Sequence, residues 1–341
     1  MSGAITWSEL ISQPDRWTVL LDRLARPGEL PQVSLDEFDE VVLVGSGTSY
    51  YLAMAAADWI RRHHAVAVRA VPSCEVMLDP LEVANPHGRR RLAIGFSRSG
   101  ESSELVLAVK AMKLAGFTVL AVSCSEGSSL LRLSHHVFHI PEGHEDGLVM
   151  LRSFTSMLMA VQFLFGTDAD RQALRALPEI GRRILAQHAS IQALAQSRPF
   201  DRFVFLASGP HYPLAVEASL KIQEMAISTS EAYQSLEYRH GPKATADAET
   251  LVSLMPLSDR HHGLALARDL KALGVALLVT GPGAADYVDI ADLTIDPAVE
   301  MSAGVSAATT LLPLQVMAFE TAIRRGQDPD APVNLAKVVL F

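Results

Sequence analysis

The chain has 341 residues, 49% of them hydrophobic, so it can fill the cores of two ordinary domains. Its formal net charge is -9 at pH 7 and it has no dense run of lysine and arginine, which disfavours nucleic acid as a partner. Cys74 and Cys124 lie far apart and suggest neither a disulfide framework nor a metal site, and no apolar run is long enough to span a bilayer. We therefore expect a protein of the reducing cytoplasm that binds no metal and no membrane.

Residues 1–35 look like a leading pair of helices, interrupted by Pro14 and Pro27. The run 41–44 is apolar and β-branched, and a Gly/Ser/Thr turn and an alanine-rich helix follow it. That order is typical of a buried parallel strand that leads into a crossover helix. The pattern continues with a strand over 91–96, a helix over 105–115 and a strand over 117–122.

The same pattern recurs after a shift of 162 residues, which carries Ser46 onto Ser208 and Tyr50 onto Tyr212. Residues 203–222 align with residues 41–60 without a gap. A strand over 250–255, a helix over 264–273 and a strand over 275–279 then repeat the later part of the first copy. This internal duplication predicts two similar domains.

Strands that alternate with short helices imply a parallel, doubly wound sheet in each copy. We expect an α/β protein with two tandem flavodoxin-like domains of three layers each, at residues 36–180 and 181–330. Residues 1–35 would form an N-terminal helical segment and residues 331–341 a C-terminal tail. The polar stretch 168–198 is interpreted as a helical connection between the two domains.

A row of hydroxyl side chains in segment 97–103 follows one predicted strand, at the end where open α/β sheets bind ligands. Free N–H groups at the start of the next helix, and a glycine at position 100, favour an anion such as phosphate. Serines also cap helices and fill turns, so the cluster alone leaves that interpretation open. The duplicate turn at 256–262 lacks the hydroxyl row, which favours a role beyond the turn itself.

The turn 45–50 contains only part of the dinucleotide-binding pattern G-x-G-x-x-G, because Tyr50 occupies the third glycine position. A nucleotide cofactor is therefore weakly indicated. A short loop that holds sugar oxygens fits these residues better.

Glu217, Lys221 and Glu224 stand at i, i+4 and i+7 on one stripe of a mostly apolar helix. Two carboxylates and an amine at this spacing suit proton transfer on a sugar. The spacing also suits ion pairs on a solvated helix face, and both interpretations stay open. Taken singly, His240 would be a turn histidine and Lys337 a tail lysine.

Taken together, the motifs resemble the sugar isomerase (SIS) domain family. The duplicated strand–turn–helix unit carries the likeness, with segments 97–102, 219–224, 239–242 and 334–338. The chain looks most like the isomerase half of glucosamine-6-phosphate synthase, the stand-alone amino-sugar-phosphate deaminase/isomerases and the fructosamine-phosphate deglycases. The likeness extends from about residue 36 to the end.

The resemblance implies a pocket for a sugar and its phosphate, lined by Ser46, Gly47, Thr48, Ser49, Ser97, Arg98, Ser99 and Ser102. Glu217 would hold sugar hydroxyls, and Glu224 would carry a proton between C1 and C2 through a cis-enediol(amine). His240 would open the sugar ring, reaching in from the partner subunit of a homodimer. Lys221 would lie beside the enediol oxygens, and Lys337 would close over the substrate and assist ring opening.

Arg98 stands where the synthase carries glutamine, and its charge suits a phosphate or a sulfonate. We expect no N-terminal nucleophile domain, and we therefore expect no transfer of nitrogen from glutamine. The leading hypothesis is a cofactor-independent deaminase/isomerase of a hexosamine 6-phosphate. The alternatives are a fructosamine-6-phosphate deglycase, a simple phosphosugar or sulfosugar aldose–ketose isomerase, and a non-catalytic sugar-phosphate sensor.

Overall fold

The structure, a computed structural model, describes residues 2–85 and 87–341. The chain forms two compact units. The first unit comprises Asp15–Asp146, Met150–Arg175 and Ala336–Phe341. The second unit comprises the residues up to Pro14, Gly147–Val149 and Ala176–Leu335. Neither unit is a single stretch of chain, and the contiguous domain ranges expected from the sequence stay a prediction.

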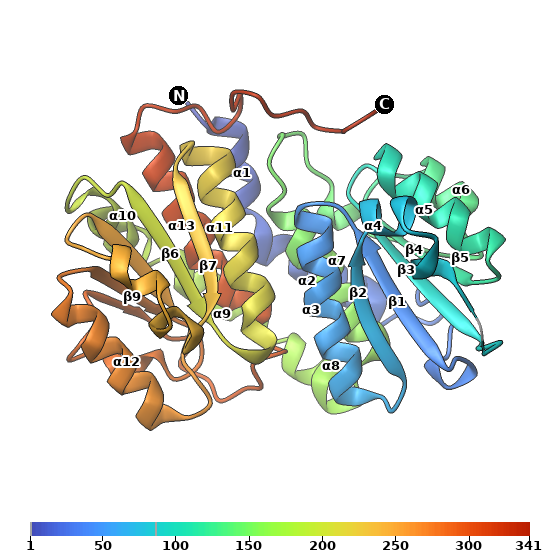
Figure 1. The fold of residues 1–341 in the computed structure, drawn as a ribbon, viewed down its shortest axis with the longest axis horizontal. Helices are drawn as coiled ribbons and strands as arrows, with labels where there is room; N and C mark the ends of the chain where they lie inside the picture. Colours follow the sequence, from blue (N-terminus) through green and yellow to red (C-terminus); the bar gives the residue numbers. More distant parts are fainter. Residues whose placement is uncertain (1, 86) are drawn as a thin grey trace. The chain divides into compact units, whose positions relative to one another are not determined.

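The first unit contains a parallel five-stranded sheet of order β2-β1-β3-β4-β5 (Figure 1). Its strands are β1 (Glu40–Gly45), β2 (Ala67–Pro72), β3 (Arg91–Ser97), β4 (Thr118–Ser123) and β5 (His136–His139). Its helices are α2 (Gln13–Leu24, which starts at the unit boundary), α3 (Thr48–His63), α4 (Ser73–Leu78), α5 (Ser103–Leu114), α6 (Ser129–Leu133), α7 (Arg152–Phe165) and α8 (Asp168–Leu174).

Helices cover both faces of this sheet. Side chains of β1, β3 and β4 pack against α5 and α6 in one buried apolar cluster, while α3 packs against β1, β2 and α7. Strands covered on both faces need apolar residues at every position, which is why β1 and β3 read as continuous apolar runs.

The second unit contains another parallel five-stranded sheet, of order β10-β9-β8-β6-β7. Its strands are β6 (Arg202–Ala207), β7 (Thr229–Gln234), β8 (Thr250–Leu254), β9 (Ala276–Thr280) and β10 (Leu293–Ile295). Its helices are α1 (Ala4–Ile11), α9 (Leu177–Leu185), α10 (His188–Gln196), α11 (Tyr212–Ala226), α12 (Arg260–Ala272) and α13 (Ala307–Arg324). The helix α12 packs on one face, and α11 packs against β6, β7 and α13.

The two sheets repeat each other, which confirms the predicted fold class. Order β2-β1-β3-β4-β5 in the first unit corresponds to β7-β6-β8-β9-β10 in the second, and β1 and β6 have the same bounds after the shift of 162 residues. The helices that follow β1 and β6 start at different positions in the repeat. After β6 a 3₁₀ turn spans Gly209–His211, with Pro210 in its first turn, so α11 begins two positions later in the repeat than α3.

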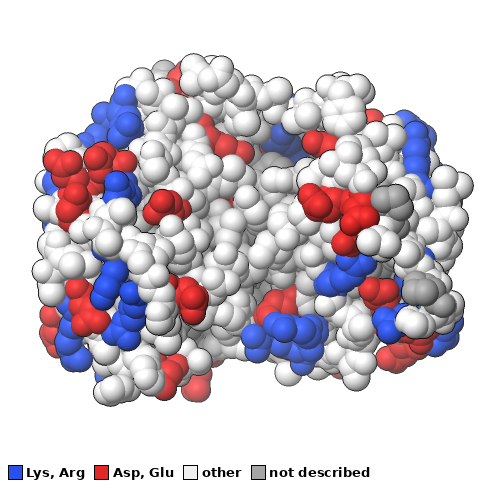
Figure 2. All heavy atoms as spheres, viewed as in Figure 1, with Lys and Arg blue, Asp and Glu red and all other residues white. Residues whose placement is uncertain are grey.

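The connection 168–198 is helical, as expected, and forms α8, α9 and α10. Among the described residues, no helix combines the length and apolarity needed to cross a membrane. Within each unit, acidic and basic side chains are interspersed on the face seen in Figure 2, and no broad basic surface covers that face.

Candidate functional site

Two of the predicted loops lie side by side at the carboxyl edge of the first sheet. The strands β1 and β3 are neighbours, and the chain leaves them in opposite directions, toward β2 and toward β4. Open α/β sheets bind ligands at such a switch point. The structure therefore brings segment 46–49 and segment 97–102 to one edge of the first unit.

The loop after β1 is shaped by Gly47, whose φ of 54° and ψ of -129° are costly for a residue with a side chain. Ser46 Oγ is buried and has no hydrogen-bond partner among the described residues. Thr48 and Ser49 are buried and begin α3, with Ser49 Oγ 3.9 Å from Met150 Sδ. A buried hydroxyl without a partner favours a polar ligand at this point.

The loop after β3 is held by its own serines. Ser97 Oγ accepts a 2.8 Å bond from the Gly100 N–H, and Ser99 Oγ accepts a 3.2 Å bond from the Glu101 N–H. These two serines thus stabilise the turn, which is the structural role that serines commonly have in turns. Ser102 precedes α5 and its side chain makes no capping bond, which leaves its hydroxyl available at the helix N-terminus.

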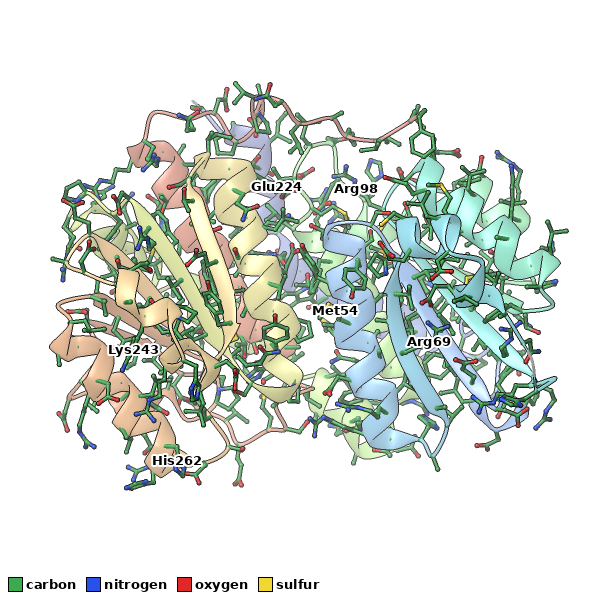
Figure 3. The ribbon with its side chains drawn as sticks, in the orientation of Figure 1. Met54, Arg69, Arg98, Glu224, Lys243 and His262 are labelled. Carbon is green, nitrogen blue, oxygen red and sulfur yellow. The ribbon has the colours of Figure 1, made fainter. Side chains whose placement is uncertain are left out.

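Arg98 lies just beyond the end of β3 (Figure 3) and is only 6% exposed. Its Nη2 donates a 2.9 Å bond to the carbonyl oxygen of Lys337, and its Nη1 lies 3.7 Å from Glu145 Oε2. Glu145 is itself buried and accepts bonds from the N–H groups of Leu151 and Ser153, at 2.7 and 3.0 Å. The guanidinium is therefore fixed on a rigid carboxylate.

The last residues of the chain pack on this same loop. Lys337 Nζ donates 2.9 Å bonds to the carbonyl oxygens of both Glu145 and Asp146. The Val339 carbonyl oxygen accepts a 3.1 Å bond from the N–H of Ser103, at the start of α5. Lys337 and Arg98 thus belong to one cluster in the first unit.

Glu217, Lys221 and Glu224 form a connected ion-pair cluster on α11 in the second unit. Lys221 Nζ lies 3.2 Å from Glu217 Oε1 and also pairs with Glu224 Oε2. The side chains of Glu217 and Lys221 are 0% exposed, whereas that of Glu224 is 16% exposed. The pairing matches the ion-pair interpretation, but the stripe is buried rather than solvated. Figure 3 labels Glu224 on this helix.

The charge state of Lys221 follows from its surroundings. Burial alone lowers the pKa of its ammonium, but the carboxylates of Glu217 and Glu224 outweigh burial, so the pKa is raised. Lys221 therefore remains a cation at neutral pH. A cationic amine is no nucleophile, but it can stabilise negative charge that develops beside it.

One further candidate, His240, is not part of this cluster. His240 is exposed after a 3₁₀ turn over Glu237–Arg239, and its side chain makes no hydrogen bond or ion pair with any described residue. The structure therefore does not bring it to the Lys221 cluster within the chain.

The sequence interpretation missed Glu145. This carboxylate orders the loop before α7 and faces Arg98, yet it stands in an irregular segment with no periodicity that marks it. Among the described residues, one exposed group, Asp259, His261 and His262 at the start of α12, has the spacing to hold a metal ion, and it contains none of the predicted site residues.

Comparison with known proteins identifies the family. The SIS domain family profile matches residues 35–166 and 198–325. The chain belongs to the SIS domain family. Both matched segments contain one of the two parallel sheets, so this is a tandem SIS-domain protein.

Sequence similarity to curated proteins extends over most of this chain. This chain is 31% identical over 313 residues to the isomerizing glutamine–fructose-6-phosphate aminotransferase of Pyrobaculum aerophilum, covering 88% of this chain and 51% of that protein. It is 30% identical over 323 residues to the enzyme of the same name from Photorhabdus laumondii, covering 89% and 52%. The chain spans about half the length of the curated relatives it matches.

Solved structures match over nearly the whole chain. Glucosamine-6-phosphate deaminase from Thermotoga maritima has 27% identity and a TM-score of 0.79, covering 99% of this chain and 100% of that one. Tagatose-6-phosphate ketose/aldose isomerase from Escherichia coli has a TM-score of 0.83 with 24% identity, covering 97% of each chain, and shows the shared fold alone.

Proposed function

We propose that this SIS protein is an enzyme that binds a sugar phosphate and moves a proton between its C1 and C2 carbons. The leading substrate is a hexosamine 6-phosphate, which water would convert to a ketose phosphate and ammonia. The observation that carries the proposal is the buried cluster on α11, in which Glu224 is the one carboxylate with an exposed fraction. The similarity to a glucosamine-6-phosphate deaminase supports the choice of substrate.

Glu224 is the proposed base. It would take the proton from C2 of the open-chain sugar, giving a cis-enolamine, and return it to C1, giving an iminium at C2. Water would then add to C2 and ammonia would leave. Lys221 stays cationic beside Glu224 and would stabilise the oxyanion that develops at C1 during the first transfer.

The phosphate is assigned to the first unit. Three groups at one sheet edge can donate hydrogen bonds to it. They are Ser46 Oγ, which has no hydrogen-bond partner among the described residues, the Ser102 hydroxyl, which makes no capping bond, and the buried guanidinium of Arg98. Charge-assisted bonds from arginine and from a helix N-terminus suit a phosphate dianion.

The deciding experiment measures turnover and solvent deuterium uptake for Glu224→Gln across a panel of sugar phosphates. The variant should keep sugar-phosphate affinity and lose activity by roughly 100- to 10,000-fold, because general base catalysis contributes about that much. Full turnover by the variant would sink the proposal. In the unmodified protein, ammonia identifies the deaminase, a free amino acid from a fructosamine phosphate identifies the deglycase, and neither identifies the simple isomerase. Binding without turnover identifies a sensor.

We also propose a cytoplasmic homodimer in which His240 serves the site of the partner subunit. The exposed, unpaired imidazole of His240 supports this assignment. Glu224→Gln and His240→Ala would each be inactive alone. Refolded together in equal amounts they should regain about one quarter of the activity, because half of the dimers are hybrids and each hybrid has one intact site. If the mixture recovers no activity, Glu224 and His240 do not act together across two subunits.

A further inference from the structure

A cavity of about 440 Å³ lies in the second unit, where α1 and α10 meet α13. Figure 1 shows α1 beside α13. The side chains that define its chemistry are Trp7, His188, Gln192, Phe319, Glu320 and Ile323. None of the residues proposed above for sugar-phosphate chemistry lines it. Its volume is in the range of pockets that hold small organic ligands.

Aromatic rings form one wall. The Trp7 ring centroid lies 4.6 Å from that of His188 and 4.9 Å from that of Phe319. Gly3 closes the wall, since its φ of 71° favours glycine and any β-carbon there would lie 2.7 Å from the Phe319 ring. The faces of tryptophan and phenylalanine rings attract cations.

A buried carboxylate lies among these rings. Glu320 is 3% exposed, and its two oxygens accept bonds from His188 Nε2 at 2.6 Å and Gln192 Nε2 at 2.9 Å. Among the residues that the structure describes, no lysine or arginine lines the cavity. The two partners of this carboxylate are an imidazole and an amide, and neither is a permanent cation, so a cation in the cavity would be favoured.

Two further carboxylates cap the start of α1, next to the cavity wall at Gly3. Asp328 and Asp330 accept bonds from the N–H groups of Gly3 and Thr6 at the start of α1, at 2.9 and 2.8 Å. Arg324, one turn beyond Glu320 on α13, instead donates to the carbonyl oxygen of Ala195 at 2.7 Å. The carboxylates of Asp328 and Asp330 therefore bind the start of α1, while the guanidinium of Arg324 binds a carbonyl oxygen of α10.

We propose that this cavity is a binding site for a small organic cation of the ammonium class. The charged group would lie against Trp7 and Phe319 and near the Glu320 carboxylate, and the alkyl part would contact Ile323. The site is separate in chemistry from the sugar-phosphate site, because it offers a carboxylate and aromatic faces rather than anion donors.

Calorimetric titration with choline and with its uncharged isostere, 3,3-dimethylbutan-1-ol, tests the charge requirement on the whole chain. Choline should bind one to one and at least tenfold more tightly than the alcohol. Glu320→Gln should abolish that preference, while Glu179→Gln, which removes an exposed carboxylate of the same unit, should retain it. Equal binding of the two compounds, or no binding of choline, would overturn the proposal.

A second variant covers the case in which Glu320→Gln does not fold. Ile323 is 36% exposed, so a tryptophan at this position can fill the cavity while Glu320 itself is left unchanged. Ile323→Trp should keep its thermal unfolding midpoint and lose choline binding by at least tenfold. Undiminished choline binding by this variant would place the ligand elsewhere and refute the assignment.

Discussion

Arg98 Nη2 donates a 2.9 Å hydrogen bond to the carbonyl oxygen of Lys337, although 239 positions in the sequence separate the two residues. The Ser103 N–H likewise donates a 3.1 Å hydrogen bond to the carbonyl oxygen of Val339. The tail therefore places two neutral acceptors on donors that would suit an anion.

Ending the chain at Leu335 should free these donors. We expect inorganic phosphate to bind severalfold more tightly to the shortened chain, while turnover falls because the Lys337 amine is lost. Lys337→Met is the matched control, since it keeps the carbonyl oxygen and should lower turnover without changing phosphate affinity. Titration calorimetry with phosphate decides the point, and weaker binding by the shortened chain would show that the tail does not compete.

Gly100→Ala should cost far more stability than an ordinary glycine substitution. Gly100 has a φ of 68°, and an added β-carbon would lie 2.1 Å from Ser128 Oγ and 2.5 Å from its Cβ. We expect a loss of roughly 3 kcal/mol or more in urea unfolding. Gly116→Ala is the control, because its φ of 83° is similar but nothing lies within 4 Å, and it should cost about 1 kcal/mol. Equal losses would show that contact with Ser128 is unimportant.

Lys221→Met should destabilise the second unit, because it removes the cation that pairs with the buried carboxylate of Glu217. Breaking a buried pair from one side costs about 3–5 kcal/mol. Adding Glu217→Gln to the variant should recover much of that loss, and denaturant unfolding of both proteins measures it. Lys271→Met, which breaks a partly exposed pair with Asp292, should cost less than about 1 kcal/mol. A small effect at Lys221 would mean that the pair adds little to stability.

Tyr238→Phe should flatten the alkaline decline in stability. Burial raises the pKa of the Tyr238 phenol from its ordinary value near 10 to about 12, so above pH 10 the unfolded chain loses this proton more readily than the folded chain. Stability from this group is complete below pH 10 and is lost as pH rises toward 12. The phenol oxygen has no partner among the described residues, so the variant should match the parent at pH 8 and lose about 1 kcal/mol less at pH 11. Parallel declines would refute this.

The elements that the sequence predicted best are the buried ones. Continuous apolar runs and the repeat predicted the strands β1, β3, β4, β6, β8 and β9 and the helices α3, α5, α11 and α12. The strands β2, β5, β7 and β10 were not predicted, because each is partly exposed and its polar residues hide the strand pattern.

The site divides in the same way. Helical spacing correctly predicted that Glu217, Lys221 and Glu224 share one face, because that periodicity is local. It could not show that the face is buried, since burial depends on packing against β6, β7 and α13. The contacts of Arg98 with Glu145 and Lys337 join distant segments and leave no mark in the sequence.

Because both units are discontinuous in sequence, neither unit can complete its fold until distant segments of the chain have been synthesised. A ribosome makes most of the first unit early, yet the strand-to-helix loop at its sheet edge receives its last partners only with Ala336–Phe341. The second unit, by contrast, needs its earliest residues, because Asp328 and Asp330 hold the start of α1. Expressing the two halves from a cut near residue 175 would thus give fragments that each lack a piece of their own fold.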